Sequence, residues 1–150
     1  FLFDPRDHSA KEKINLLKER EWFRPTAGTV LYEYRNEWFD LKSKDETPFM
    51  SYVFKVNNNK NIPGITHVDN TCRIQTLKKE QNYHYYNLIH AFYKRTGVPI
   101  LLNTSFNLAG QPLVNDGFQA ARVMTHYKNK DLCNYLYLPE LGKLYNKEDL

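Results

Sequence analysis

Cysteine is scarce in this sequence, and several features that define large protein classes are missing. The 150 residues include only two cysteines, Cys72 and Cys133. Two are too few for a disulfide scaffold and they lack the C-x-x-C spacing of a zinc site, so we expect reduced, packed thiols. No apolar run approaches the roughly eighteen residues that cross a bilayer, and residues 1–6 do not resemble a cleavable leader. The expectation is a cytoplasmic protein that makes no contact with a membrane.

Charge of one sign is not in large excess. There are 21 basic and 17 acidic side chains, which leave a net charge of +4 and a pI near 9.0. An anionic partner is favoured, but charges of both signs are mixed, so nucleic-acid binding is permitted without being implied. Hydrophobic residues make up 41% of the chain and aromatic residues 15%. This composition excludes a disordered protein and predicts one domain, residues 1–150, with its own core.

Three segments carry helix signals. The first, residues 10–20, begins with a capping box at Ser9. The second ends before Gly97, and the third is expected to be capped by Asn115 or Asp116. The apolar residues expected on these helices are Ile14, Leu16, Leu17, Tyr85, Leu88, Ile89, Phe92, Phe118, Ala121 and Met124.

Strand signals, by contrast, are short and spread along the whole chain. The segments concerned are residues 30–34, 49–56, 62–68, 71–77, 98–102 and 135–138. Residues 37–47 predict a loop or short helix, and residues 57–61 a hairpin tip. Because strands and helices interleave without strict alternation, we expect an α/β or α+β layer with a mixed sheet.

Polar residues follow directly after the apolar run 98–102. Asn103, Ser105 and Asn107 stand where the chain would leave a buried strand, which is where open sheets often bind ligands. Neutral hydrogen-bonding groups suit a compact polar ligand such as a phosphate, a carbamoyl group or an acyl adenylate. Plain connectivity between two elements is the competing interpretation.

A metal site is not expected in this chain. His67 and Asp69 resemble half of one, but a single histidine and a single carboxylate fall far short of a ligand set. The aromatic residues around the second helix are expected to pack in the core, because their spacing is helical.

Six motifs occur together over nearly the whole chain. They are Asp4-Pro5-Arg6, Lys18-x-Arg20-Glu21-x-Phe23-Arg24-Pro25, Pro48-Phe49-Met50, Ile62-Pro63-x-Ile65-Thr66-His67-Val68-Asp69, Arg73-x-Gln75 and Thr96-Gly97-Val98-Pro99-x-Leu101-Leu102-Asn103-Thr104-Ser105-Phe106-Asn107. In this order they resemble the C-terminal domain of the O-carbamoyltransferases, the family of the nodulation and antibiotic-tailoring carbamoyltransferases. The resemblance implies a YrdC-like fold, a twisted mixed sheet flanked by helices.

The resemblance also implies a function. The domain would form carbamoyl adenylate from carbamoyl phosphate and ATP, with Mg²⁺ arriving on ATP. A separate N-terminal actin-type ATPase-like domain, from which this piece looks excised, would then transfer the carbamoyl group to a hydroxyl of a small molecule or sugar. The family carries an Arg-Ser segment ahead of Asp4, and this chain starts after it, so we expect an incomplete pocket. Gly28 stands where the family often has proline, a loop change to which we assign no role.

The matching positions suggest individual roles. The substrates are polyanions, so the site must offset their repulsion. The implied catalytic residues are Lys18, Arg73 and Ser105, and the implied substrate-binding and nucleotide-binding residues are Arg24, Asn103, Asn107, Arg6 and Gln75. Read without the resemblance, Lys18 could complement a helix dipole, Arg73 could be a solvated edge residue and Arg6 a structural salt-bridge former.

A non-catalytic alternative uses the same fold. A YrdC-like module could hold double-stranded RNA or a partner domain on a basic surface, although nucleic acid is the less favoured partner. The enzyme requires Lys18, Arg24, Arg73 and Ser105 to converge, whereas the module requires cations spread over an open face.

Overall fold

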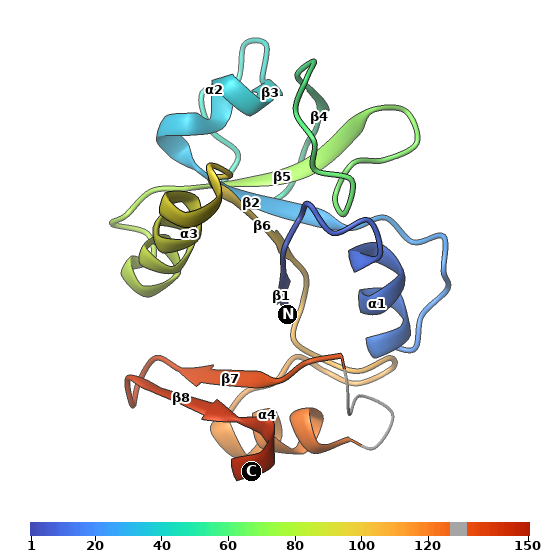
Figure 1. Ribbon diagram of the computed structural model, residues 1–150, viewed down its shortest axis with the longest axis vertical. Coiled ribbons are helices and arrows are strands. Elements are labelled where there is room, and N and C mark those ends of the chain that lie inside the picture. The colour runs from blue at the N-terminus through green and yellow to red at the C-terminus, as the bar shows by residue number, and fades with distance from the viewer. Residues whose placement is uncertain (127–131) are drawn as a thin grey trace. The chain divides into compact units, whose positions relative to one another are not determined.

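A computed structural model describes residues 1–126 and 132–150 of the chain. The chain divides into two compact units (Figure 1). The sheet unit comprises Phe1–Lys11 and Pro25–Thr104, and the hairpin unit comprises Glu12–Arg24 and Ser105–Leu150. Helix α1 (Ala10–Leu17) begins in the first unit and continues in the second.

The sheet unit is built on one six-stranded mixed sheet with the strand order β1-β6-β2-β5-β4-β3. Strands β2 and β5 are parallel, and every other neighbouring pair is antiparallel. The strands are β1 (Leu2–Phe3), β2 (Ala27–Leu31), β3 (Phe39–Asp40), β4 (Val53–Val56), β5 (Thr71–Leu77) and β6 (Ile100–Asn103). This architecture confirms the predicted α/β class with a mixed sheet.

Helix α3 (Tyr83–Thr96) covers part of one face of this sheet (Figure 1). Asn82 caps its start, and Gly97 ends it with a left-handed φ of 73°, a conformation that favours glycine. Its buried Ile89 packs in one cluster with Leu31, Leu77 and Leu101, one from each of three adjacent strands. The predicted second helix and the predicted strand 71–77 are both confirmed.

Gly28 lies inside β2, so its expected placement in a loop was wrong. A Cβ atom at Gly28 would lie 2.6 Å from Ile65 Cδ1 and 3.3 Å from Ile100 Cγ2. The missing side chain therefore lets the residues around Ile65 pack directly on the sheet.

The hairpin unit contains α4 (Gly117–Thr125), paired strands β7 (Tyr135–Leu138) and β8 (Lys143–Asn146), and a short 3₁₀ helix, η3 (Lys147–Asp149). Asp116 caps α4 by accepting a hydrogen bond from the Gln119 amide at 2.7 Å, as the sequence predicted. The buried residues of α4 are Ala120, Val123 and Met124.

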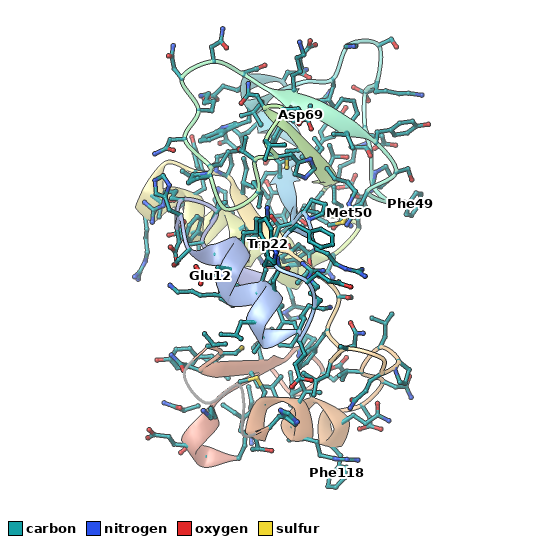
Figure 2. All side chains as sticks on the ribbon, turned by 90° about the vertical axis from the view of Figure 1, so that its right-hand side faces the viewer. Glu12, Trp22, Phe49, Met50, Asp69 and Phe118 are labelled. Carbon is teal, nitrogen blue, oxygen red and sulfur yellow. The ribbon has the colours of Figure 1, made fainter. Side chains whose placement is uncertain are left out.

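The apolar residues expected on this last helix do not all lie in the core. Phe118 is 76% exposed and projects outward from α4 (Figure 2). Ala120, not Ala121, joins Met124 and Leu136 in the core of the hairpin unit. Phe118 and Ala121 are three residues apart and therefore share a helix face. The face that packs in the core is the adjacent one, which carries Ala120, Val123 and Met124.

Several predicted elements were too long. Residues 30–34 leave the sheet after Leu31, and η1 (Tyr32–Tyr34) and α2 (Arg35–Trp38) follow. The Arg35 side chain stabilises this turn, because Nη1 donates to the Tyr32 carbonyl at 2.8 Å. The predicted first helix ends at Leu17, since Glu19 takes a left-handed φ of 51°.

Other strand predictions failed where turns interrupt the extended chain. Of residues 49–56 only Val53–Val56 is a strand, because Met50 has a left-handed φ of 54°. Residues 62–68 form no strand, since the Thr66 amide folds back onto the Ile62 carbonyl at 3.1 Å. Residues 57–61 form a turn at the start of the long connection between the antiparallel strands β4 and β5, and are not a hairpin tip by themselves, because β5 begins only at Thr71. Strands β1, β3 and β8 were not predicted.

Both cysteines are free thiols, as expected. Cys72 is buried in β5, and burial raises the pKa of its thiol to about 12. Among the described residues, no helix is long and apolar enough to span a bilayer.

Candidate functional site

Lys18 lies immediately after α1 in the hairpin unit. Its side chain contacts the loop that begins at Ser105 in the same unit. Its Nζ donates to the Ser105 carbonyl at 2.7 Å, to Ser105 Oγ at 2.5 Å and to Asn107 Oδ1 at 2.8 Å. All three acceptors are uncharged oxygens. The structure thus brings together three of the eight predicted site residues: Lys18, Ser105 and Asn107.

The ammonium group of Lys18 has a lowered pKa. The residue is only 5% exposed. Burial, with a further contribution from the positive charge of Arg20, lowers the pKa of Lys18 to about 8. A bound anion would oppose both effects, because an opposite charge nearby favours the ammonium form.

The side chain of Asn107 has a defined orientation in this loop. Its Nδ2 donates to the carbonyls of Leu108 at 3.1 Å and Gln111 at 3.0 Å. Since carbonyls only accept, Oδ1 must face the other way, where it accepts from Lys18 and from Ser105 Oγ at 2.7 Å. Asn107 therefore supports the turn and positions both neighbours.

Arg24 lies at the end of a segment that Asn15 organises. The buried Asn15 side chain donates to the carbonyls of Trp22 at 2.9 Å and Arg24 at 3.1 Å, and accepts from Arg20 Nε at 2.5 Å. The Arg24 guanidinium itself pairs with Glu21 at 2.6 Å on the surface. Sequence reasoning missed Asn15; the signal available was a polar residue flanked by the apolar Ile14 and Leu16.

In the sheet unit, Asn103 and Gln75 belong to a polar row that crosses three adjacent strands. Asn103 Nδ2, at the end of β6, donates to Thr29 Oγ1 at 3.0 Å and to Gln75 Oε1 at 3.3 Å. The Thr29 hydroxyl donates to Gln75 Oε1 at 3.0 Å. Thr29 is fully buried and was not predicted, because a threonine in an apolar strand looks like an ordinary β-branched residue.

The buried hydroxyl of Tyr85, on α3, makes no hydrogen bond to any residue that the structure describes. Burial raises the pKa of this phenol, and the nearby Thr29 hydroxyl lowers it slightly. The phenol therefore stays protonated and borders the polar row as a neutral group.

Arg73 and Arg6, the other two predicted residues of the sheet unit, differ in how their charges are compensated. Arg73 is exposed on β5, and its guanidinium forms no hydrogen bond or ion pair within residues 1–126 and 132–150. Arg6 binds both carboxylate oxygens of Asp4, through Nε at 3.0 Å and Nη2 at 2.6 Å. Its geometry fits the salt-bridge former that the sequence left as an alternative.

The eight residues are thus divided between the units. Convergence of all eight in one pocket stays a prediction. The residues of the hairpin unit are Lys18, Arg24, Ser105 and Asn107, and those of the sheet unit are Arg6, Arg73, Gln75 and Asn103.

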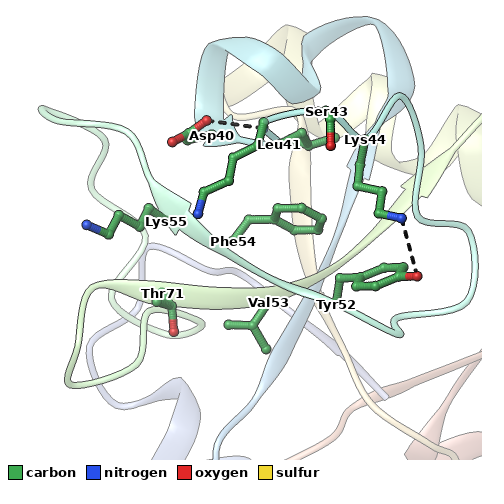
Figure 3. A pocket seen from close by; sticks show the side chains of 10 residues that line it. Asp40, Leu41, Ser43, Lys44, Tyr52, Val53, Phe54, Lys55 and Thr71 are labelled. Atoms are coloured by element: carbon green, nitrogen blue, oxygen red, sulfur yellow. Dashed lines mark hydrogen bonds between the residues drawn. The ribbon is translucent and has the colours of Figure 1, made fainter.

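A cavity of about 360 Å³ in the sheet unit contains none of the predicted residues. Three lysines line it, Lys42, Lys44 and Lys55, together with Tyr52 and Phe54 (Figure 3). Lys44 Nζ lies 4.6 Å from the centre of the Tyr52 ring. We call this cavity the lysine pocket.

His67 and Asp69 both contact Thr71. His67 Nδ1 lies 3.2 Å from Thr71 Oγ1, its Nε2 lies 3.1 Å from the Thr26 carbonyl, and Thr71 Oγ1 donates to Asp69 at 2.6 Å. These contacts stabilise the turn before β5. No group of three or more histidine, cysteine, aspartate or glutamate side chains is placed to hold a metal ion within the described part of the chain.

Comparison with known proteins agrees with the resemblance seen in the sequence. Residues 1–138 match the family model described as the carbamoyltransferase C-terminus. The nodulation protein NolNO of Sinorhizobium fredii is 47% identical over 135 residues, which are 87% of this chain and 19% of that protein. The nodulation protein NolO of Bradyrhizobium diazoefficiens is 46% identical over 117 residues, 75% of this chain and 21% of that protein.

A named enzyme is also similar. The 3'-hydroxymethylcephem-O-carbamoyltransferase of Amycolatopsis lactamdurans is 32% identical over 114 residues, which are 76% of this chain and 22% of the enzyme. The chain thus spans about a fifth of the length of these relatives. On the family model that matches residues 1–138, the chain belongs to the carbamoyltransferase C-terminus family.

Proposed function

We propose that this chain is the adenylate-forming part of a carbamoyltransferase. Water takes up the phosphoryl group of carbamoyl phosphate, a carbamate oxygen bonds to the α-phosphorus of ATP, and the bond to pyrophosphate breaks. The products are carbamoyl adenylate, pyrophosphate and inorganic phosphate. Family membership and the similarity to an O-carbamoyltransferase support the transferred group.

The observation that carries the proposal is the contact of Lys18 with Ser105 and Asn107. Phosphoryl chemistry needs positioned positive charge more than a covalent nucleophile. The Lys18 ammonium can exchange neutral oxygen acceptors for charged phosphate oxygens, because charge-assisted hydrogen bonds are the stronger ones. The Ser105 hydroxyl would bind the same group.

The sheet unit would contribute Arg73, whose planar guanidinium can bind two phosphate oxygens at once. Asn103 and Gln75 would bind the uncharged end of the substrate. Arg24 and Arg6 would have to exchange Glu21 and Asp4 for phosphate. Mg²⁺ would arrive on ATP, which needs few protein ligands for it.

The second half of the overall reaction would take place in another part of the enzyme. Since the chain covers about a fifth of its relatives, we assign transfer of the carbamoyl group to an N-terminal actin-type ATPase-like domain. Its acceptor would be a hydroxyl of a small molecule or sugar.

Two experiments test the proposal. Titration of this chain with ATP or carbamoyl phosphate, followed by NMR, should give a Kd around the millimolar range, roughly 4 kcal/mol of binding free energy, with shifts at Ser105. An enzyme of the relatives' length that contains this chain should release pyrophosphate from ATP only when carbamoyl phosphate is present. Absence of such release would overturn the proposal.

The lysine pocket favours a second candidate, a binding module for double-stranded RNA or an acidic partner domain. None of its three lysines forms an ion pair with a carboxylate in the described part of the chain. Asp45 and Glu46 are paired with Arg35 and Lys78, and Asp40, which lines the pocket, accepts a hydrogen bond from the Lys42 amide at 3.2 Å. RNA binding that weakens steeply with salt and is lost on changing all three lysines to glutamine would support the module. Unchanged RNA binding by that variant would exclude it.

A further inference from the structure

The amide of Gln75 has only one possible orientation. Its Nε2 donates to the carbonyl of Pro48 at 3.0 Å. A carbonyl can only accept, so the amide nitrogen must face Pro48 and Oε1 must face Thr29 and Asn103. The backbone of Pro48 therefore sets the direction of the whole polar row.

The orientation of Asn103 follows from that of Gln75. Gln75 Oε1 accepts from the Thr29 hydroxyl at 3.0 Å, which uses the only proton that Thr29 can donate. The side chain of Asn103 must then present its nitrogen to both groups, and Nδ2 lies 3.0 Å from Thr29 Oγ1 and 3.3 Å from Gln75 Oε1. Both amide protons of Asn103 are thereby engaged inside the protein.

The carbonyl oxygen of Asn103 is left for a ligand. Asn103 Oδ1 accepts no hydrogen bond from any residue in 1–126 or 132–150, and the residue is half-buried. A half-buried acceptor without a donor gains most from a ligand that carries one. Asn103 Oδ1 therefore favours a ligand that places a hydrogen-bond donor beside it and disfavours a ligand that places an acceptor there.

We infer that Asn103 Oδ1 binds the NH₂ group of the carbamoyl substrate and that Thr29 acts as a positioning residue that holds this oxygen outward. The inference rests on the proposed function and explains how the site would distinguish carbamoyl phosphate from acetyl phosphate. Acetyl phosphate has the same shape with a methyl group in place of NH₂. A methyl group cannot donate, so it would leave Asn103 Oδ1 unpaired, and such sites reject the analogue that lacks the donor.

The position of Arg73 is compatible with this assignment. Gly28 is paired with Leu102 and Ala27 with Arg73, so Asn103, Ala27 and Arg73 are level on three adjacent strands. Residues on the first and third strands are about 10 Å apart at the backbone. The small side chain of Ala27 separates them, and the long Arg73 side chain can reach a phosphate whose other end binds Asn103.

The test compares the two substrates in an enzyme of the relatives' length that contains this chain. For carbamoyl phosphate we measure kcat/KM for pyrophosphate release, and for acetyl phosphate we measure its inhibition constant. In Asn103→Leu, the preference for carbamoyl over acetyl phosphate should fall by about 10- to 100-fold, the effect of one lost hydrogen bond to a half-buried acceptor. Thr29→Val should act in the same direction, and Thr29→Ser should restore the preference.

Controls separate the possible failures. Asn58→Leu makes the same change at an exposed turn position and should leave the preference unchanged. If the parent enzyme releases no pyrophosphate, the proposed function fails. If the parent is active and Asn103→Leu keeps the preference at the parent value, the proposed function stands and this inference is overturned. Thermal unfolding of each variant shows whether it is folded.

Discussion

Lys18 and Ser105 are 87 positions apart in the sequence, yet the Lys18 ammonium lies 2.7 Å from the Ser105 carbonyl oxygen and 2.5 Å from its hydroxyl. A buried lysine with a pKa near 8 changes charge within the range in which enzymes are assayed. Changing the pH therefore tests the role of Lys18 in this part of the site.

Anion binding by this chain should weaken as Lys18 loses its proton. Sulfate is a suitable probe, because its charge does not change in this range. One unit above its pKa only about a tenth of a group remains protonated, so the affinity for sulfate should fall about tenfold between pH 7 and pH 9. NMR titration at both pH values measures it. In Lys18→Gln the affinity should be low and independent of pH; a variant that keeps the pH dependence would assign it to another group.

The stability of the folded chain, unlike its affinity for anions, should increase with pH. The folded-state pKa of Lys18, about 8, lies below its ordinary value of 10.5. Between these values the unfolded chain binds more protons, so this residue makes the free energy of unfolding rise as pH increases. Urea denaturation of the parent and of Lys18→Met at pH 7 and pH 9.5 checks this. The parent should gain stability relative to the variant, and parallel changes would contradict the lowered pKa.

Arg73→Ala should reduce adenylate formation by more than tenfold in an enzyme of the relatives' length. A lost charge-assisted contact in a desolvated site is worth roughly 1.5–3 kcal/mol. Thermal stability should hardly change, since the guanidinium has no partner among the described residues. Arg95→Ala, an exposed arginine in the last turn of α3, is the matched control. Loss of folding in Arg73→Ala, with normal nucleotide binding by the folded fraction, would make Arg73 structural.

Gly28→Ala should destabilise the sheet unit by about 1–3 kcal/mol, the usual cost of overpacking. The new Cβ would lie 2.6 Å from Ile65 Cδ1. Ile65→Val removes that methyl group, so the double variant should be more stable than the sum of the two single changes predicts. Urea denaturation gives all four values, and strict additivity would place the strain elsewhere.

This chain alone should not carbamoylate a hydroxyl acceptor. Attack by an alcohol needs a base or a metal to take its proton, and the proposed function assigns this step to another part of the enzyme. Mass spectrometry after incubation with carbamoyl phosphate, ATP and a panel of sugars provides the measurement. Carbamoylated product would show that the acceptor site lies within these 150 residues.

Local sequence signals were sufficient wherever a periodic pattern ended at a clear stop residue. Gly97 ends α3 as predicted, and the predicted strand 71–77 has the same bounds as β5. The same signals overextended the strands at 30–34 and 49–56, because left-handed residues and side-chain contacts such as that of Arg35 turn the chain without changing its apolar character.

The sequence by itself determined the α/β class, the family and the kinds of groups available for binding, since these depend on local pattern and on motifs. Only the tertiary structure decided which of these groups meet. Strand register places Thr29 opposite Gln75, and the Pro48 carbonyl then orients Gln75. The turn after α1 delivers Lys18 to Ser105. Such contacts join residues far apart in the chain, and their formation depends on the packing of whole elements, which no local pattern encodes.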